Sequence, residues 1–199
     1  MKINYQEEGT PKPIFYVFSG IDKTLSNNTF KKTYYGDRAP IHDDYDLDPD
    51  CVHALNFLLS NLEEKYDTRL VITSNRRANQ HNCINYLKNN GLNYDKPIAF
   101  TKMIHGTRGE KVVEFLESNG ATPLTYHTAP LYVRLLKRFK DNPDFNNYVV
   151  LDGSGKSYSR YIPKSQIKKI SPKTGLTKDM AFDILVENGI KLIQFDMGN

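Results

Sequence analysis

Cysteine, long apolar runs and a dominant charge of one sign are all scarce in this sequence of 199 residues. The two cysteines, Cys51 and Cys83, lack the Cys-x-x-Cys spacing and neighbouring histidines that are typical of zinc sites. No stretch approaches the roughly 18 apolar residues of a membrane-spanning helix, and residues 1–13 lack the apolar segment of a secretory signal. We therefore expect a soluble protein of a reducing, cytoplasmic compartment without a membrane partner, although a non-classical secretion signal would not be visible.

The composition indicates a globular chain. A hydrophobic fraction of 39% is sufficient for a buried core, so we expect a single domain over residues 1–199. The formal net charge of +4 comes from basic residues that are scattered along the chain rather than gathered in a tail. This charge is compatible with an anionic ligand but does not require nucleic acid.

Apolar runs that end in polar residues alternate with segments of helical periodicity. Strands are predicted at 14–18, 69–73, 97–101, 148–151 and 166–170. Helices are predicted at 49–66 and 76–90, within residues 105–116 after a short loop, at 130–139 and from Thr177. Alternation of this kind predicts a three-layer α/β/α Rossmann-like fold with a mostly parallel sheet.

Residues 26–49 show neither a helical nor a strand period, which favours an irregular flap over an inserted cap domain. The acidic run in this segment invites a metal-site interpretation, but acidic loops that precede a helix are more often solvated. Asp48 or Asp50 is well placed to cap the next helix. The residues concerned are His42, Asp43, Asp44, Asp46, Asp48 and Asp50.

Polar chemistry follows the first predicted strand directly, at the strand end where open α/β sheets bind ligands. Residues 14–25 read Ile-Phe-Tyr-Val-Phe-Ser-Gly-Ile-Asp-Lys-Thr-Leu. This segment resembles motif I, Asp-x-Asp-x-Thr, of the haloacid dehalogenase (HAD) superfamily of Mg-dependent phosphatases. In that comparison Gly20 stands at the position of the nucleophilic aspartate, and Asp22 stands at the position of the general acid and base.

Three later strand ends extend the resemblance, which covers about residues 14–185. Thr73, with Ser74 as the alternative, matches the motif II hydroxyl that binds a phosphoryl oxygen, although Ser74 or Asn75 could equally cap the following helix. Lys111, slightly favoured over Arg108, matches the cation of motif III. Asp152 matches the first acid of motif IV, while Gly153 replaces the second. The sequence is also similar to the small branch of Swiss Army Knife RNA repair-associated HAD domains and to bacterial effector phosphatases.

The resemblance implies a phosphatase that uses Mg²⁺, with Asp22 and Asp152 as its metal-binding residues. Because Gly20 supplies neither a nucleophile nor a metal ligand, we expect weakened Mg²⁺ binding and an inactive chain. A non-catalytic module that binds phosphate or protein is one alternative. A phosphatase that processes nucleic-acid ends is another, and a different α/β family with coincidental strand ends is a third.

The absence of a predicted cap domain bears on ligand size. Caps enclose small substrates and exclude water from the site, so an uncapped site favours a phosphate group carried by a macromolecule. We expect a phosphoprotein ahead of RNA, since the sequence shows no evident platform of aromatic and basic residues. The sequence does not predict an oligomeric state.

Overall fold

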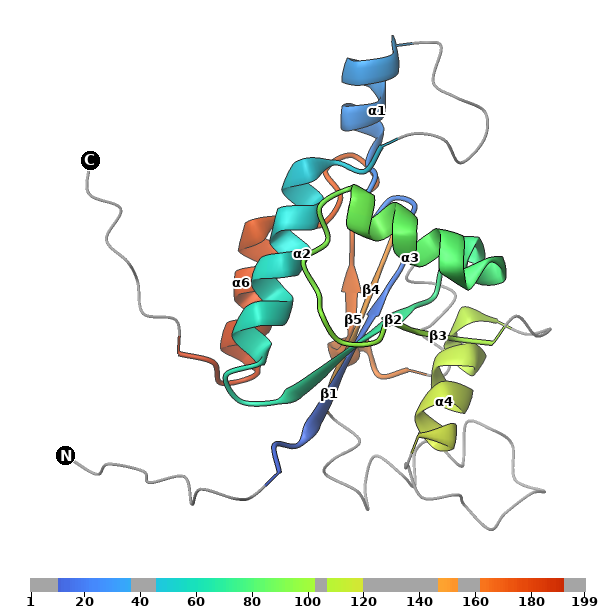
Figure 1. Cartoon of the computed structure of the whole chain (residues 1–199). Coiled ribbons are helices and arrows are strands. Elements are labelled where there is room, and N and C mark those ends of the chain that lie inside the picture. The colour runs from blue at the N-terminus through green and yellow to red at the C-terminus, as the bar shows by residue number, and fades with distance from the viewer. Residues whose placement is uncertain (1–10, 37–45, 103–106, 120–146, 154–161, 192–199) are drawn as a thin grey trace.

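The computed structural model describes residues 11–36, 46–102, 107–119, 147–153 and 162–191, and its strands form one parallel sheet in the order β3-β2-β1-β4-β5 (Figure 1). The strands are β1 (Ile14–Ser19), β2 (Asp67–Ile72), β3 (Ala99–Phe100), β4 (Tyr148–Asp152) and β5 (Ile167–Lys169). Helices cover both faces of this sheet. The predicted three-layer α/β fold is therefore confirmed.

Strand β1 lies at the centre of the sheet. It pairs with β2 along its whole length and with β4 from Tyr16 to Ser19. The strand predicted at 97–101 is only two residues long, and it begins after Pro97, which has no N–H to donate to a ladder.

Side chains of β1 alternate between the two faces of the sheet, as strand geometry requires. Phe15 and Val17 pack into a large core with α2 (Pro49–Leu62), α3 (Gln80–Asn89) and α6 (Lys178–Glu187). Phe18 packs on the opposite face in a smaller core that includes Val112 of α4 (Arg108–Ser118). The central strand is therefore buried on both sides, which explains why its sequence is a continuous apolar run.

The helices follow the predicted order, with shifted boundaries. They are α2 (Pro49–Leu62), the 3₁₀ turn η2 (Asn75–Ala78), α3 (Gln80–Asn89), α4 (Arg108–Ser118), the 3₁₀ turn η5 (Lys164–Gln166) and α6 (Lys178–Glu187). Asp48 and Thr177 cap α2 and α6 as predicted. The single helix predicted at 76–90 is divided into η2 and α3, because Asn79 caps a new helix by accepting from the N–H of Asn82. The helix predicted at 130–139 lies outside the described residues.

The prediction of an irregular segment at 26–49 is wrong in its first part, where the structure has helix α1 (Asn28–Tyr35). Asn27 caps this helix by accepting from the N–H of Phe30 at 2.8 Å. None of the helical residues is buried, so α1 has no apolar stripe facing the core and gave no periodic signal in the sequence. Tyr34 of α1 is 70% exposed.

The acidic run has structural partners where it is described. Asp46 contacts the Tyr35 hydroxyl, and Asp48 caps α2 and also contacts Asn27. No group of three or more metal-binding side chains gathers within the described ranges. His42, Asp43 and Asp44 lie outside those ranges. Among the helices that the structure describes, none is long and apolar enough to cross a membrane.

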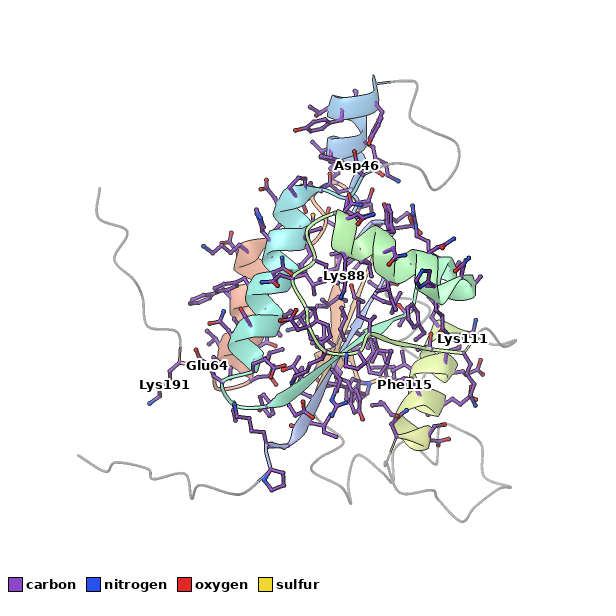
Figure 2. The ribbon with its side chains drawn as sticks, in the orientation of Figure 1. Asp46, Glu64, Lys88, Lys111, Phe115 and Lys191 are labelled. Atoms are coloured by element: carbon purple, nitrogen blue, oxygen red, sulfur yellow. The ribbon has the colours of Figure 1, made fainter. Side chains whose placement is uncertain are left out.

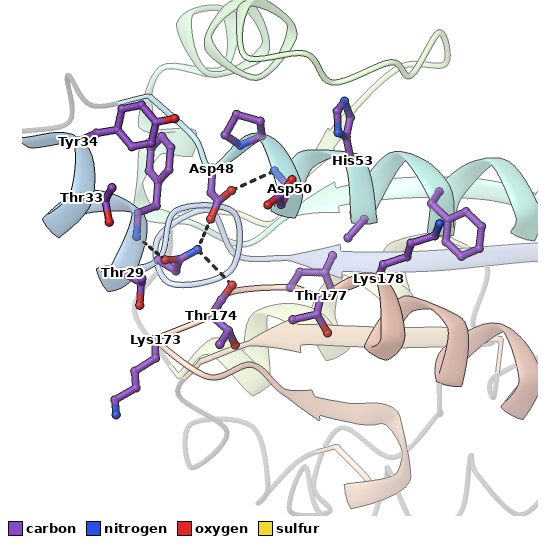
Figure 3. A pocket seen from close by; sticks show the side chains of 16 residues that line it. Thr29, Thr33, Tyr34, Asp48, Asp50, His53, Lys173, Thr174, Thr177 and Lys178 are labelled. Atoms are coloured by element: carbon purple, nitrogen blue, oxygen red, sulfur yellow. Dashed lines mark hydrogen bonds between the residues drawn. The ribbon is translucent and has the colours of Figure 1, made fainter. Parts of the chain in front are cut away.

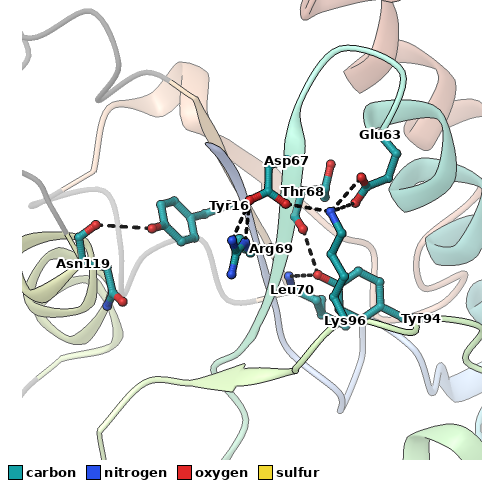
Figure 4. Close-up of polar contacts among 9 residues, drawn as sticks. All are labelled: Tyr16, Glu63, Asp67, Thr68, Arg69, Leu70, Tyr94, Lys96 and Asn119. Carbon is teal, nitrogen blue, oxygen red and sulfur yellow. Dashed lines mark hydrogen bonds and ion pairs between the residues drawn. The ribbon is translucent and has the colours of Figure 1, made fainter. Parts of the chain in front are cut away.

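A network of charged side chains lies at the amino end of β2 (Figure 4). Asp67 accepts hydrogen bonds from Arg69 at 2.6 Å and from Lys96 at 2.7 Å, and Lys96 also contacts Glu63. The hydrogen bonds from Arg69 and Lys96 hold the pKa of the Asp67 carboxyl below its usual value. Tyr94 adds a buried contact, since its hydroxyl donates to Thr68 O and accepts from Leu70 N. This network ties β2 to α2 and to the segment that precedes β3.

Candidate functional site

The strand order reverses at the carboxyl ends of β1 and β4, a region that we call the crevice. Connections run from β1 outward to β2 and β3, and then return to place β4 on the other side of β1. Open α/β sheets bind ligands where the direction of strand order reverses in this way. Ser19 pairs with Leu151, and the N–H of Gly20 donates to Leu151 O at 3.1 Å, so Gly20 and Asp152 are neighbours at this point.

The position that a Cβ atom would take at Gly20 faces the crevice. A Cβ atom built on this residue would lie 3.2 Å from Oδ2 of Asp152 and 3.2 Å from Oγ1 of Thr24. The Thr24 hydroxyl is fully buried and has no hydrogen-bond partner among the described residues. A side chain at position 20 would therefore lie against both groups, and a Cβ atom fits there only if one of them shifts by a few tenths of an ångström. Ser19 does not fill this role, because its buried hydroxyl donates to Gly20 O.

The loop after Gly20 is a tight turn. Leu25 N donates to Ile21 O at 2.8 Å, and Lys23 N donates to Ser26 O at 2.9 Å. Lys23 adopts a φ of 67°, a left-handed conformation that is uncommon for a residue with a side chain. The turn leaves the side chain of Asp22 45% exposed at the mouth of the crevice.

Asp22 faces the end of β2. The Ser74 hydroxyl lies 3.5 Å from Asp22 Oδ2, and Arg76 Nε lies 3.6 Å from Asp22 Oδ1. The Arg76 side chain is only 8% exposed, and its guanidinium lies 4.5 Å from the centre of the Tyr86 ring. Arg76 was not among the predicted site residues. In the sequence, Arg76 stands two residues after Ser74, the hydroxyl residue that follows β2.

The two hydroxyl residues after β2 have different environments. Thr73 is buried, and its N–H donates to Ser19 O at 2.9 Å, which extends the pairing of β1 and β2. Ser74 caps η2 by accepting from the N–H of Arg76, so the capping interpretation of Ser74 holds, and the same hydroxyl faces Asp22. The structure therefore brings Ser74, Asp22 and Arg76 together at one side of the crevice.

Arg108 occupies the other side of the crevice. Its Nη1 atom lies 2.6 Å from Oδ2 of Asp152, whose side chain is 3% exposed. Thr107 and Glu110 form a capping box that makes Arg108 the first residue of α4. Lys111 lies one turn further along α4 (Figure 2). The favoured position for the motif III cation was Lys111, whereas the contact to Asp152 comes from Arg108.

Gly153 has a packing reason to lack a side chain. A Cβ atom at this residue would lie 3.2 Å from the Cβ of Lys23 and 3.5 Å from Ile170 O. An acidic side chain there would require the Lys23 turn to move. The second acid of motif IV would therefore need a shift of a few tenths of an ångström in this turn.

These residues do not fit a Mg²⁺ ion. Magnesium in proteins is held by anionic oxygens in near-octahedral geometry. Among the described residues of this crevice, only Asp152 offers a buried carboxylate, and that carboxylate already contacts the Arg108 guanidinium. Gly20 and Gly153 supply no side-chain ligand, and Asp22 faces Arg76.

A pocket lies between α1, the start of α2 and the residues that lead into α6 (Figure 3). This aromatic groove has a volume of about 980 Å³. Its wall includes the Phe30 and Tyr34 rings, whose centres are 4.5 Å apart, and the Phe57 ring, which lies 5.5 Å from Lys178 Nζ. Asn27 joins its walls, since its amide contacts Asp48 and donates to Thr174 O at 3.1 Å.

Gly175 connects the aromatic groove to the crevice. It has a φ of +67°, and a Cβ there would lie 2.4 Å from Cys51 Sγ and 2.9 Å from Thr24 O. Leu176 N donates to the same Thr24 carbonyl at 2.8 Å. The backbone at Gly175 therefore packs directly against the turn that carries Asp22 and Thr24.

No protein-family model, no curated protein and no solved structure matches this chain. The chemistry of the crevice must therefore be judged from its own residues. It combines two arginines, two aspartates, buried hydroxyls and a strand end, but it has no carboxylate at position 20.

Proposed function

We propose that this chain is a HAD-type protein that binds a phosphomonoester at the carboxyl edge of its sheet without hydrolysing it. The observation that carries the proposal is the direction of the Gly20 Cβ position, toward Asp152 and Thr24 at the reversal of strand order. A phosphatase of this type would need a nucleophilic carboxylate at that point. Here the position carries only hydrogen.

The cations around the crevice support phosphate binding. Arg76 lies near Asp22 on one side of the crevice. Arg108 contacts Asp152 on the other side. A guanidinium carries five N–H donors in a planar fork, so it can hold a carboxylate and a phosphoryl oxygen at the same time. The Thr24 hydroxyl, which has no hydrogen-bond partner among the described residues, adds a donor beside the Gly20 Cβ position.

The proposed ligand is a phosphate group on a protein. All residues between β2 and β3 are described, and they hold only η2, α3 and their connections. In the described part of the segment between β1 and α2, α1 is the only helix. Neither segment contributes a described cap over the crevice, so a phosphorylated side chain on a large partner can approach it.

A phosphorylated nucleic-acid end is the second candidate, and the aromatic groove favours it. Rings that lie beside lysines are typical of single-strand binding, and Phe30, Tyr34 and Phe57 lie there with Lys173 and Lys178. The same groove also contains the carboxylates of Asp48 and Asp50, which offset the two lysines. A polyanion gains little from such a balanced surface, so the phosphoprotein remains the first candidate.

The test measures affinity by fluorescence anisotropy with a labelled phosphoserine peptide and its unphosphorylated form. We expect the phosphorylated peptide to bind at least about tenfold more tightly, equivalent to about 1.4 kcal/mol. Arg108→Gln should remove this difference. Arg69→Gln is the matched control, because Arg69 also pairs with an aspartate but lies at the amino end of β2.

Equal binding of the two peptides would contradict the proposal, and so would an Arg108→Gln protein that still distinguishes them. The same assay compares a short oligonucleotide with and without a 5′-phosphate. Clear preference for the phosphorylated oligonucleotide over the phosphopeptide would move the second candidate to first place.

A further inference from the structure

The most buried carboxylate of the crevice, that of Asp152, contacts an arginine side chain. Asp152 is 3% exposed, and Arg108 Nη1 lies 2.6 Å from its Oδ2 atom. A carboxylate removed from water is strongly disfavoured unless a positive group lies against it. In a metal-dependent site that group is a divalent cation, whereas here it is a guanidinium.

Two further positions agree with this assignment. Gly20 has no side chain, so it adds no second carboxylate beside Asp152 and Thr24. Gly153 has none either, because Lys23 packs against it. One carboxylate against one guanidinium is a neutral pair, which leaves little attraction for an added divalent ion.

The guanidinium is held in place by its helix. Arg108 is the first residue of α4, and the capping box of Thr107 and Glu110 fixes that end of the helix. Val112 and Leu116 anchor α4 to the sheet in the smaller core. A cation mounted in this way is already positioned before a ligand arrives, which lowers the entropic cost of binding.

We infer that Arg108 takes the place of a divalent metal ion in this crevice, so that the site binds an anionic ligand without metal. The identity of that ligand as phosphate rests on the proposed function. The inference that metal is excluded does not depend on the proposed function. It depends on the contact of Arg108 with Asp152 and on Gly20 and Gly153. The two parts can therefore be tested separately.

The first experiment titrates the protein with Mn²⁺ alone and follows free Mn²⁺ by electron paramagnetic resonance. The wild-type chain should bind no more tightly than about 10⁻³ M, the weak end of protein sites for hard divalent cations. The double variant Gly20→Asp, Arg108→Gln places two carboxylates together and removes the guanidinium, so it should bind at least about tenfold more tightly. Gly20→Asp with Arg108 retained should gain less, because the guanidinium still competes for both carboxylates.

Wild-type binding of Mn²⁺ tighter than that limit, and lost in Asp152→Asn, would overturn the inference. The wild-type titration is sufficient for this decision even if a double variant does not fold, and circular dichroism checks folding. Arg69→Gln again serves as the matched control and should leave Mn²⁺ binding unchanged.

The second experiment measures binding of inorganic phosphate to the wild-type chain by calorimetry, once with EDTA and once with Mg²⁺. The two affinities should agree within about twofold, a difference of about 0.4 kcal/mol. A loss of about tenfold or more in EDTA would overturn the metal inference while the proposed function stood. Absence of phosphate binding in both buffers would refute the proposed function, and the Mn²⁺ titration would still decide the role of Arg108.

Discussion

Arg108 and Asp152 form a contact of 2.6 Å between two groups of very different exposure. The Arg108 side chain is 39% exposed, whereas that of Asp152 is 3% exposed. Water can therefore replace Asp152 around the guanidinium far more easily than it can replace Arg108 around the carboxylate. Removal of the Arg108 guanidinium should therefore destabilise the fold more than removal of the Asp152 charge.

We predict that Arg108→Gln destabilises the fold by about 3 kcal/mol, because it leaves a buried carboxylate without its cation. Asp152→Asn should cost about 1 kcal/mol, since the remaining guanidinium is partly hydrated. Urea denaturation at neutral pH gives both free energies of unfolding. Equal costs for the two variants would show that burial of Asp152 does not control the energetics of the pair.

Hydrolysis should be negligible in the chain as it stands. Loss of a covalent nucleophile typically lowers the rate by several powers of ten, and Gly20 offers no side chain at the expected position. The measurement is release of an aryl alcohol from an aryl phosphate in the presence of Mg²⁺. Turnover that is abolished by Asp22→Asn would instead indicate that Asp22 activates water directly.

Gly175 and Gly36 provide a comparison of two glycines with positive φ. Gly36→Ala should cost about 1–2 kcal/mol from backbone strain alone, because nothing lies within 4 Å of its Cβ position. Gly175→Ala should lower the free energy of unfolding by a further ~1–3 kcal/mol, because its Cβ would overlap with Cys51 and with Thr24 O. Thermal unfolding of both variants measures the difference. Similar melting temperatures would mean that the chain at Gly175 can move away from the turn.

Asp67 should make stability depend on pH. Its pKa is lowered in the folded state by hydrogen bonds from Arg69 and then Lys96. The unfolded chain therefore takes up a proton first as the pH falls, so the stabilisation is complete above about pH 4 and disappears as the pH falls through the folded pKa. Asp67→Asn should cost about 1 kcal/mol at pH 7, and the cost should shrink below about pH 4.

The measurement is chemical denaturation of the wild type and Asp67→Asn at a series of pH values. Asp183→Asn on the exposed side of α6 is the control and should have little effect at any pH. A cost of Asp67→Asn that stays constant down to pH 3 would contradict the assignment of the Asp67 pKa shift.

The parts of the fold that could be predicted from the sequence are those that bury apolar surface. Strands β1 and β4 and the second half of β2, residues 70–72, are apolar runs because both of their faces are covered. The caps Asp48 and Thr177 each precede a periodic helix and were found for that reason. Helix α1 was missed because it buries none of its residues and is held instead by the polar contacts of Asn27.

The crevice was predicted only in part. The strand ends identify Asp22 and Asp152, since polar residues follow apolar runs there. The choice between Arg108 and Lys111 depends on where α4 begins, and the capping box of Thr107 and Glu110 would have indicated that start. Arg76 stands two residues after Ser74 in the sequence, but its contact with Asp22 depends on the packing of η2.

The central position of β1 also determines when the crevice can exist. Of the described strands, β1 comes first in the chain and can pair early with β2, whereas β4 begins only at Tyr148. Until then one edge of the central strand is open, and closing so long a loop is slow. Gly20 and Asp152 become neighbours only at that late step, so a ligand at this crevice distinguishes a completely folded molecule from a nascent one.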